Sequence, residues 1–283
     1  MRLLLSVTGL ALDTLREHKL RSFLTVLGVI IGTGTIIGVG SILAGLDSAV
    51  TGVIRAMGAN TAIVFKVRMG PNFGGRTPEE RGRKPLTYED AVAIAERCPA
   101  VENVSPYLLP PNVFQRAGPG FSTDRARYRG ADYFGPQVAG STERYAASAQ
   151  VEMLSGRFFT GAEDLHRLPV AAIGEDIYRA LFGVEDAIGK IITVDGHEVE
   201  VIGVMRRPTA SLPGQEDNRI LMPYFTMHKM FAAAQENLLM VQAKDGQLAE
   251  AMDELRVVLR QRRHVAFSAP DNFYVSKIGR AHV

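Results

Sequence analysis

The sequence predicts a membrane-anchored α+β protein, with one N-terminal transmembrane helix followed by an extracytoplasmic domain. Three observations lead to this fold class. An uncharged apolar stretch covers 22–46, a strand–helix–strand pattern occurs twice, at about 61–114 and 238–267, and a strand-rich section of about 100 residues separates the two patterns. This order of elements favours a domain of two βαβ-like repeats with an inserted strand-rich lobe.

The uncharged stretch is long enough to cross a bilayer as a helix. Its 25 residues include thirteen Leu, Ile, Val or Phe, and a helix of that length measures about 37 Å against a hydrocarbon core of about 30 Å. One alternative is a buried helix of a soluble protein, but such helices seldom run this far without a charge. A cleavable signal peptide is another, although its apolar region is normally about 7–15 residues long. We therefore expect a transmembrane helix over 23–46.

Basic residues predict the orientation of this helix. Arg16, Lys19 and Arg21 stand just before the span, whereas the twenty positions after it carry only two basic residues. The positive-inside rule then places the N-terminus in the cytoplasm and the main domain outside. The segment 1–22 is too short to span and is amphipathic, which predicts a cytoplasmic helix lying in the membrane interface.

Glycines divide the apolar stretch into two small-xxx-small pairs. Gly28 pairs with Gly32, and Gly34 pairs with Gly38. Such pairs let a second membrane helix approach closely. The simpler explanation is that glycine is common in transmembrane helices, but two pairs within eleven residues favour helix packing.

The extracytoplasmic domain is expected over 47–270, and its first repeat over about 60–115. The pattern predicts a strand, a solvated loop, a helix and a second strand, at 61–67, 70–85, 87–98 and 104–114. Thr87 and Asp90 occupy the positions of a capping box at the start of the helix. Cys98 falls on the apolar face of this helix, so a buried thiol is expected, and Pro106 is expected to break up the second strand.

The inserted lobe is expected over about 120–222, and the second half of the repeat lobe over 225–268. Asp195–Gly196 lies between two alternating apolar runs, which is the strongest short signal for a β-hairpin. The other elements expected are strands, helices and one flexible loop, at 169–173, 175–182, 206–217, 219–222, 238–243, 247–261 and 264–267.

Composition and motifs argue against several functional classes. The net charge is +2 and tryptophan is absent, which does not suit a nucleic-acid-binding protein. A single cysteine cannot form an internal disulfide, and neither HExxH nor GxSxG occurs. The segment 183–190 resembles a phosphate-binding loop, but it has five residues between its glycines, and Ile191 replaces the required Ser or Thr. We therefore expect no catalytic residue, no cofactor and no metal site.

Several ordered segments resemble those of MacB/FtsX-type ABC transporter permeases. The most specific is LRSFLTVLGVIIG at 20–32, which is similar to the first membrane segment of that family. Weaker landmarks follow in the same order as in the family, at 57–61 (MGANT), 104–106 (VSP), 155–160 (SGRFFT), 189–190 (GK) and 201–204 (VIGV).

This resemblance implies a periplasmic core domain, an inner-membrane location and a non-catalytic role. Members typically have four membrane helices and work as dimers with a cytoplasmic ABC ATPase. The implied function is a permease subunit that couples ATP hydrolysis by this partner to periplasmic conformational change or export. The implied partners are the ATPase subunit, a second permease copy, a periplasmic adaptor protein and membrane lipid.

The sequence departs from the family near its end. No further apolar span follows residue 267, and 277–283 (KIGRAHV) reads like a non-native tail. We therefore expect 271–283 to be the end of a C-terminally truncated fragment. Two other interpretations share the topology. They are a single-span sensor or ligand-binding ectodomain cut before its second membrane helix, and a membrane-tethered enzyme, against which the lack of a catalytic set argues.

Overall fold

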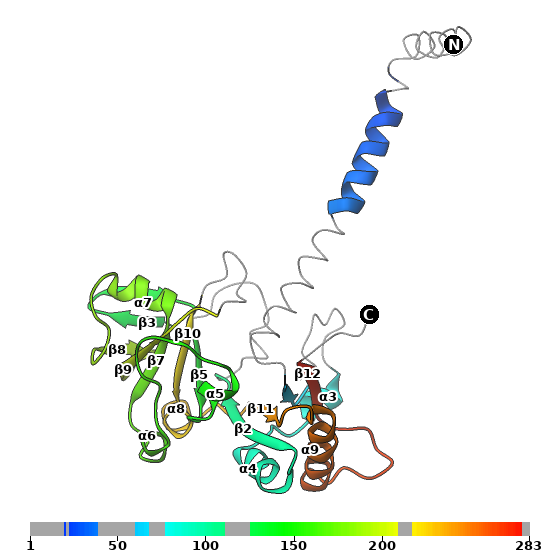
Figure 1. Cartoon of the computed structure of the whole chain (residues 1–283). Helices are drawn as coiled ribbons and strands as arrows, with labels where there is room; N and C mark the ends of the chain where they lie inside the picture. Colours follow the sequence, from blue (N-terminus) through cyan, green and yellow to red (C-terminus); the bar gives the residue numbers. More distant parts are fainter. Residues whose placement is uncertain are drawn as a thin grey trace. The chain divides into compact units, whose positions relative to one another are not determined.

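The structure is a computed structural model in which part of the chain is described. The described residues are Leu20 and 23–38, 60–67, 77–110, 125–208 and 217–278. The chain divides into two units, 1–51 and 52–283, and each is described by itself (Figure 1).

In the first unit, residues 23–38 form a continuous helix whose side chains are all exposed. Thr33 and Thr35 each donate a hydroxyl hydrogen bond of 2.7 Å to the carbonyl four residues earlier, so these hydroxyls are satisfied within the helix. The predicted span 23–46 extends past the described residues, and the interfacial segment, with Arg16, Lys19 and Arg21, lies almost wholly outside them. Within the described residues, no helix combines the length and the apolar character that crossing a membrane requires. The membrane span therefore stays a prediction.

The second unit contains two strand–helix–strand repeats that share one antiparallel sheet. The first repeat comprises β1 (Thr61–Phe65), α3 (Pro78–Gly82), α4 (Tyr88–Arg97) and β2 (Val101–Leu108), and the second comprises β11 (Asn237–Ala243), α9 (Leu248–Arg262) and β12 (Tyr274–Ile278). The strand order is β12-β1-β11-β2. Each repeat thus leaves a gap that a strand of the other fills, which is the split βαβ arrangement of ferredoxin-like folds. The predicted mixed fold of helices and strands is confirmed for this unit.

The predicted capping box of α4 and the buried Cys98 are confirmed, whereas the loop predicted before α4 is corrected. Thr87 accepts a hydrogen bond from the backbone N–H of Asp90, and Asp90 accepts one from the N–H of Thr87, so the capping box is present. Cys98 is buried, and burial with the nearby Glu254 raises the pKa of its thiol to about 11. The predicted loop 70–85 contains the short helix α3, because Thr77 begins a second capping box there.

Pro106 does not interrupt β2, contrary to the prediction. The strand runs from Val101 to Leu108, and Pro106 pairs with Leu239 of β11. Its carbonyl accepts a hydrogen bond from Ser141 of β5, so the missing N–H also faces β5, since N–H and C=O of one strand residue point to the same side. No hydrogen bond to β11 is lost, which is why this strand tolerates proline.

The strand predicted at 264–267 is wrong, and β12 takes its place. His264 turns the chain with a φ of 51°. The Arg260 guanidinium then binds the carbonyls of Ala266, Phe267 and Ala269, so they are engaged by a side chain and not by a neighbouring strand. β12 extends beyond the domain end expected at residue 270.

The inserted part continues the same sheet. It comprises β3 (Arg125–Tyr128), β4 (Ala131–Phe134), β5 (Gln137–Ser141), α5 (Tyr145–Ser148), β6 (Met153–Gly156), α6 (Gly161–Leu165), β7 (Val170–Gly174), α7 (Glu175–Phe182), β8 (Ile191–Val194), β9 (His197–Met205), β10 (Arg219–Pro223) and α8 (Tyr224–Met230). The sheet order from β2 onward is β5-β10-β7-β9-β8-β3-β4, with β6 paired to β9. The predicted hairpin is confirmed, because Asp195 and Gly196 both adopt positive φ between β8 and β9.

Alternating side chains divide the core into three apolar clusters. Val64 packs with α4 and α9 in the repeat core, whereas its neighbours Ile63 and Phe65 join a reverse-face core on the other side of the sheet. The insert core lies under α7 and α8 and includes Ile173 and Ile177. The period of two along each strand explains this division.

We expect α9 to stabilise the fold through its buried face only. Leu255→Ala removes a side chain with no exposed surface and should lower the free energy of unfolding by about 2–5 kcal/mol through lost burial and a residual cavity. Val257→Ala, on the exposed side of the same helix, is the matched control and should change it by less than about 0.5 kcal/mol. Urea unfolding followed by circular dichroism measures both, and equal losses would contradict the packing described.

Candidate functional site

The chain enters and leaves the sheet of the second unit on neighbouring strands. β1 and β12 pair antiparallel, with Thr61 opposite Ile278 and Phe65 opposite Tyr274. The first residue of β1 and the last residue of β12 therefore lie side by side. β12 and β1 thus form one end of the strand order of this sheet.

A buried ion pair joins the helices of the two repeats. Arg262, at the C-terminus of α9, donates from Nε to Oδ1 of Asp90 at 2.7 Å, and Asp90 belongs to the first turn of α4. Arg263 approaches the other oxygen of Asp90 at 3.9 Å, and the side chains of Arg263 and Asp90 are each 6% exposed. Because Asp90 also caps α4 through Thr87, one carboxylate both starts α4 and holds it to α9.

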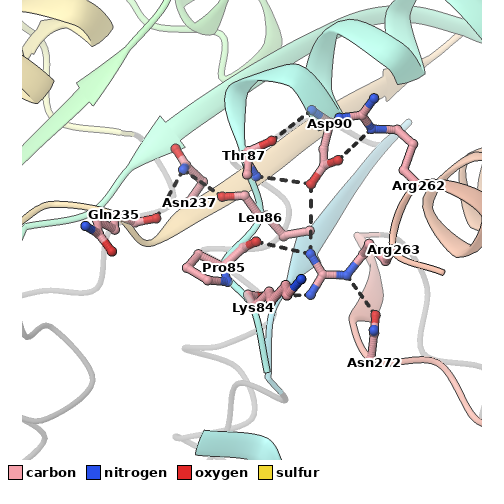
Figure 2. A network of polar contacts seen from close by, with 10 residues as sticks. All are labelled: Lys84, Pro85, Leu86, Thr87, Asp90, Gln235, Asn237, Arg262, Arg263 and Asn272. Atoms are coloured by element: carbon pink, nitrogen blue, oxygen red, sulfur yellow. Dashed lines mark hydrogen bonds and ion pairs between the residues drawn. The ribbon is translucent and has the colours of Figure 1, made fainter. Parts of the chain in front are cut away.

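Arg263 is the centre of this group, which we call the arginine junction and define as Asp90, Arg262, Arg263 and Asn272 with the carbonyls of Lys84 and Pro85 (Figure 2). Its Nη2 donates to the Lys84 carbonyl at 2.6 Å and its Nη1 to the Pro85 carbonyl at 3.1 Å. Its Nε donates to Oδ1 of Asn272 at 2.7 Å. Burial lowers the pKa of Arg263, and the charge of Asp90 opposes this shift.

The segment between α9 and β12 is attached to α9 by a second arginine. Arg260 donates to Asp271 at 2.5 Å in addition to the three carbonyls noted above, and Arg256 lies 3.2 Å from the other oxygen of Asp271. Phe273 is buried in the repeat core. The connection from α9 to β12 is therefore held at several points.

Asn237 extends the contacts from the first repeat to the inserted part. Its Nδ2 donates to the Leu86 carbonyl at 2.8 Å, and its Oδ1 accepts from the hydroxyl of Tyr224 at 3.1 Å. Leu86 precedes α4, Asn237 begins β11 and Tyr224 begins α8. Polar contacts therefore link the segment before β12, the end of α9, the segment before α4 and the start of α8.

The arginine junction is built from contacts within the protein. The guanidinium and carboxylate groups are engaged with one another or with backbone carbonyls, and within the described residues no cluster of His, Cys, Asp or Glu could hold a metal ion. The predicted packing residues Gly28, Gly32, Gly34 and Gly38 all lie on the helix 23–38, where a Cβ added to any of them meets nothing within 4 Å. Their packing role stays a prediction.

Sequence reasoning did not find the arginine junction. Arg262 and Arg263 end an amphipathic helix, where basic residues are also favoured by the helix dipole and usually lie in water. The one available signal was the capping role of Asp90, which gives no hint of a partner 172 positions away.

We expect Arg263→Ala to lower the free energy of unfolding by about 2–4 kcal/mol, because it leaves Asn272 and two backbone carbonyls without their donor and removes a positive charge from beside the buried Asp90. Arg263→Lys should recover only part of this loss, since lysine lacks the planar fork of donors. Arg97→Ala, which removes one exposed contact to Gln261 of 3.4 Å, is the control. Denaturant unfolding measures all three, and equal stability of the Arg263→Ala and Arg97→Ala proteins would contradict a central role for Arg263.

Sequence relatives match this chain over most of its length. It is 27% identical over 259 residues to the macrolide export ATP-binding/permease protein MacB of Bdellovibrio bacteriovorus, covering 91% of this chain and 38% of that protein. It is 30% identical over 223 residues to the macrolide export ATP-binding/permease protein MacB 1/2 of Paracoccus denitrificans, covering 78% of this chain and 30% of that protein. The chain thus spans less than two fifths of the length of these relatives.

Two solved structures share the fold. The periplasmic region of MacB from Actinobacillus actinomycetemcomitans gives a TM-score of 0.62 at 18% identity, covering 80% of this chain and 92% of that one. The extracellular domain of the noncanonic ABC-type transporter YknZ from Gram-positive bacteria gives 0.56 at 20% identity, covering 77% and 100%. The family model of the MacB-like periplasmic core domain matches residues 22–258. With most of its length matched by this model, the chain belongs to the MacB-like periplasmic core domain family of ABC transporter permeases.

Proposed function

We propose that this chain is part of a permease subunit that converts ATP hydrolysis in the cytoplasm into movement of its extracytoplasmic domain, or into export. The observation that carries the proposal is the pairing of β1 with β12 next to the arginine junction. A displacement reaching either strand would pass through α9 and α4 to the rest of the domain along hydrogen bonds and ion pairs. On this proposal the chain is not itself an enzyme and needs no cofactor.

The apolar helix 23–38 supports a membrane anchor. Its large apolar side chains are all at least 37% exposed, on every side of the helix. A helix that is apolar all round needs an apolar environment, either a protein core or a lipid bilayer. We propose that it forms part of a transmembrane helix over 23–46 in the bacterial inner membrane, with the cytoplasmic N-terminus set by Arg16, Lys19 and Arg21.

The glycine pairs support contacts with two other membrane helices. At about 100° per residue, the Gly28–Gly32 pair and the Gly34–Gly38 pair face directions about 120° apart. Each glycine faces open space, since an added Cβ meets nothing within 4 Å. We propose that these faces pack against helices of the same subunit or of a second permease copy.

The proposed partners follow from the family. The relatives named above are ATP-binding/permease proteins that extend well beyond the matched segment, so we propose an ATPase on a segment or subunit outside these 283 residues. A second permease copy and a periplasmic adaptor protein complete the proposed assembly. The sensor interpretation shares the single span, but membership of a permease family favours transport.

We expect single-cysteine labelling to confirm the orientation. In a Cys98→Ala background, Ser268→Cys lies in an exposed segment of the domain and should react with a membrane-impermeant maleimide on intact spheroplasts. Ser6→Cys, before the proposed span, should react only after the membrane is permeabilised. Labelling of Ser6→Cys but not of Ser268→Cys on intact cells would overturn the orientation.

We expect bulky residues on the glycine faces to weaken helix association. Gly32→Ile should lower the apparent affinity between copies in lipid vesicles at least about tenfold, because the branched side chain prevents close backbone approach. Energy transfer between donor- and acceptor-labelled copies measures this affinity. Val29→Ile, which adds bulk to a residue that is already large, is the control. Equal association of the two variants would contradict packing of Gly32 against a second permease copy.

The transport function is tested on the complete gene and its neighbours. We expect the uninterrupted gene to encode further membrane spans, and an ABC ATPase to be encoded with it or beside it. In nanodiscs, the assembled complex should hydrolyse ATP, and Arg263→Ala should change the ATPase rate while Arg97→Ala should not. A gene that continues instead into a cytoplasmic signalling helix would support the sensor interpretation and overturn the proposal.

A further inference from the structure

Three aspartates are buried in the described part of the second unit, and one of them lacks a cation. Asp90, Asp164 and Asp217 are each at most 5% exposed. Arg262 lies 2.7 Å from Asp90 and Arg219 lies 2.6 Å from Asp217, whereas no described Lys, Arg or His forms an ion pair with Asp164. A buried carboxylate of this kind is costly, because no opposite charge compensates for the water it has lost.

Asp164 acts as the capping residue of α8, although it belongs to α6. The residue before α8 is Pro223, which gives no side-chain cap, so the first N–H groups of α8 need an acceptor from elsewhere. Oδ1 of Asp164 accepts the N–H of Phe225 at 2.7 Å. The Thr226 hydroxyl donates to the Leu168 carbonyl at 2.9 Å. We call these two contacts the α6–α8 joint.

A second carboxylate lies beside this joint. A Cβ added to Gly161, the first residue of α6, would lie 3.3 Å from Cδ of Glu143. Gly161 and Asp164 are three residues apart and share one face of the helix, so both carboxylates lie on this face. Arg144 is 3.8 Å from Glu143, but 56% of its side chain is exposed, so its charge is screened by water.

Tyr88 of α4 is the other titratable group at the joint. Its ring lies 5.0 Å from that of Phe225. Burial raises the pKa of its hydroxyl, and the charges of Asp164 and Glu143 raise it further, as expected if both carboxylates are close to it. Tyr88 belongs to the repeat part, which comprises the first and second repeats, and Phe225 belongs to the inserted part. The joint therefore lies where the two parts meet.

The other ionisable groups on the elements around Asp164 are paired with one another, exposed, or placed at the far end of their helix. The pairs are Glu163 with Arg157 and Asp217 with Arg219, the exposed residues are Glu89 and His166, and the residues in the last turn of α8 are His228 and Lys229. Among the described residues, Glu143 is therefore the charged group that acts on Asp164.

From this geometry we propose that Asp164 is a proton-binding site, and that the α6–α8 joint is tighter when Asp164 is protonated than when it is ionised. A protonated carboxyl still has an oxygen that accepts the Phe225 N–H, and it needs no cation. Ionisation would place a second negative charge beside Glu143 in a buried site, which disfavours the charged form.

The direction of the pH dependence follows from the same contacts. Burial raises the pKa of Asp164 to about 6, while the Phe225 N–H opposes the shift and Glu143 adds to it. An aspartate in the unfolded chain titrates near about 3.9. Between these two values the folded protein holds a proton that the unfolded chain has lost, so stability falls as the pH rises through this window and is level above it.

This inference goes beyond the proposed function and does not depend on it. On the proposed orientation, the joint would meet the pH outside the cytoplasm, and a change in that pH would alter a contact between the two parts of the domain. The tests use the whole chain in detergent without ATP or a partner. Their failure would leave the orientation and ATPase experiments unaffected, and the reverse also holds.

The first test is the titration of the joint in the unaltered chain. The amide proton of Phe225 donates to Asp164, so its NMR chemical shift should change as the charge of its acceptor changes. We expect a midpoint near pH 6. A midpoint below about pH 5, closer to that of an ordinary aspartate, would overturn the proposal.

Asp164→Asn gives a second, independent measurement, because asparagine keeps a carbonyl oxygen for the Phe225 N–H and cannot ionise. From pH 4.5 to 7.5, the equilibrium constant for folding of the unaltered chain should fall at least about tenfold relative to that of Asp164→Asn. Urea unfolding followed by circular dichroism measures both. An equal pH dependence of the two proteins would contradict the proposal.

Asp132→Asn is the matched control. Asp132 is paired with Arg127, which lowers the pKa of this carboxyl, so it is already ionised throughout the range from pH 4.5 to 7.5. The equilibrium constant of the unaltered chain should therefore not fall relative to that of Asp132→Asn. A tenfold fall relative to both variants would show that the pH dependence does not come from Asp164, and would overturn the proposal.

Discussion

Two buried charges at the arginine junction fix the geometry of the repeat part. Removing Asp90 and Arg263 from water is costly, and the cost is offset only because nearly every polar atom of the pair has a partner. Asp90 receives the Arg262 guanidinium and the Thr87 N–H, and Arg263 donates to two carbonyls and Asn272. Helices α4 and α9 and the start of β12 are therefore positioned by one set of contacts.

The interleaved strand order makes these contacts effective. Because β11 lies between β1 and β2, and β1 between β11 and β12, neither repeat forms a sheet alone. A force on the chain before β1 or after β12 enters at adjacent positions and meets a helix pair that is already joined by ion pairs. This arrangement suits a domain that transmits movement, which is the role proposed for a permease of this family.

The inserted part is joined to this rigid assembly in a different way. The strand ladder between β2 and β5 is short and lined by hydroxyls, and apolar packing crosses the same boundary on both faces of the sheet, with Leu108 of β2 in the insert core and both parts in the reverse-face core. Proline at position 106 is compatible with β2 only because its missing donor faces this boundary. The same residue thus preserves the ladder with β11 and limits the ladder with β5.

Local patterns in the sequence determined the elements whose signals are complete within a few residues. The capping box at Thr87, the periodicity of α9 and the Asp195–Gly196 hairpin all have their physical cause in neighbouring residues, and so does the unbroken apolar helix at 23–38. Two repeats could also be expected in outline, because strand–helix–strand occurs twice, but nothing in the pattern indicated that their strands interleave.

The elements and contacts that lack a complete local signal depend on tertiary contacts. β12 forms at 274–278 because β1 offers an open edge there, and the carbonyls at 266–269 are bound by Arg260. The short strands β5 and β6 lack strong alternation and depend on partners far along the chain. In the sequence, Arg263 has the pattern of a solvated residue at a helix end. In the fold it donates to Lys84, Pro85 and Asn272, which lie elsewhere in the chain. Pairings between distant segments leave no local pattern. The sequence by itself therefore determined the apolar segment and the elements whose signals are local, and the tertiary structure decided the remaining strands and the partners that each edge and each charge meets.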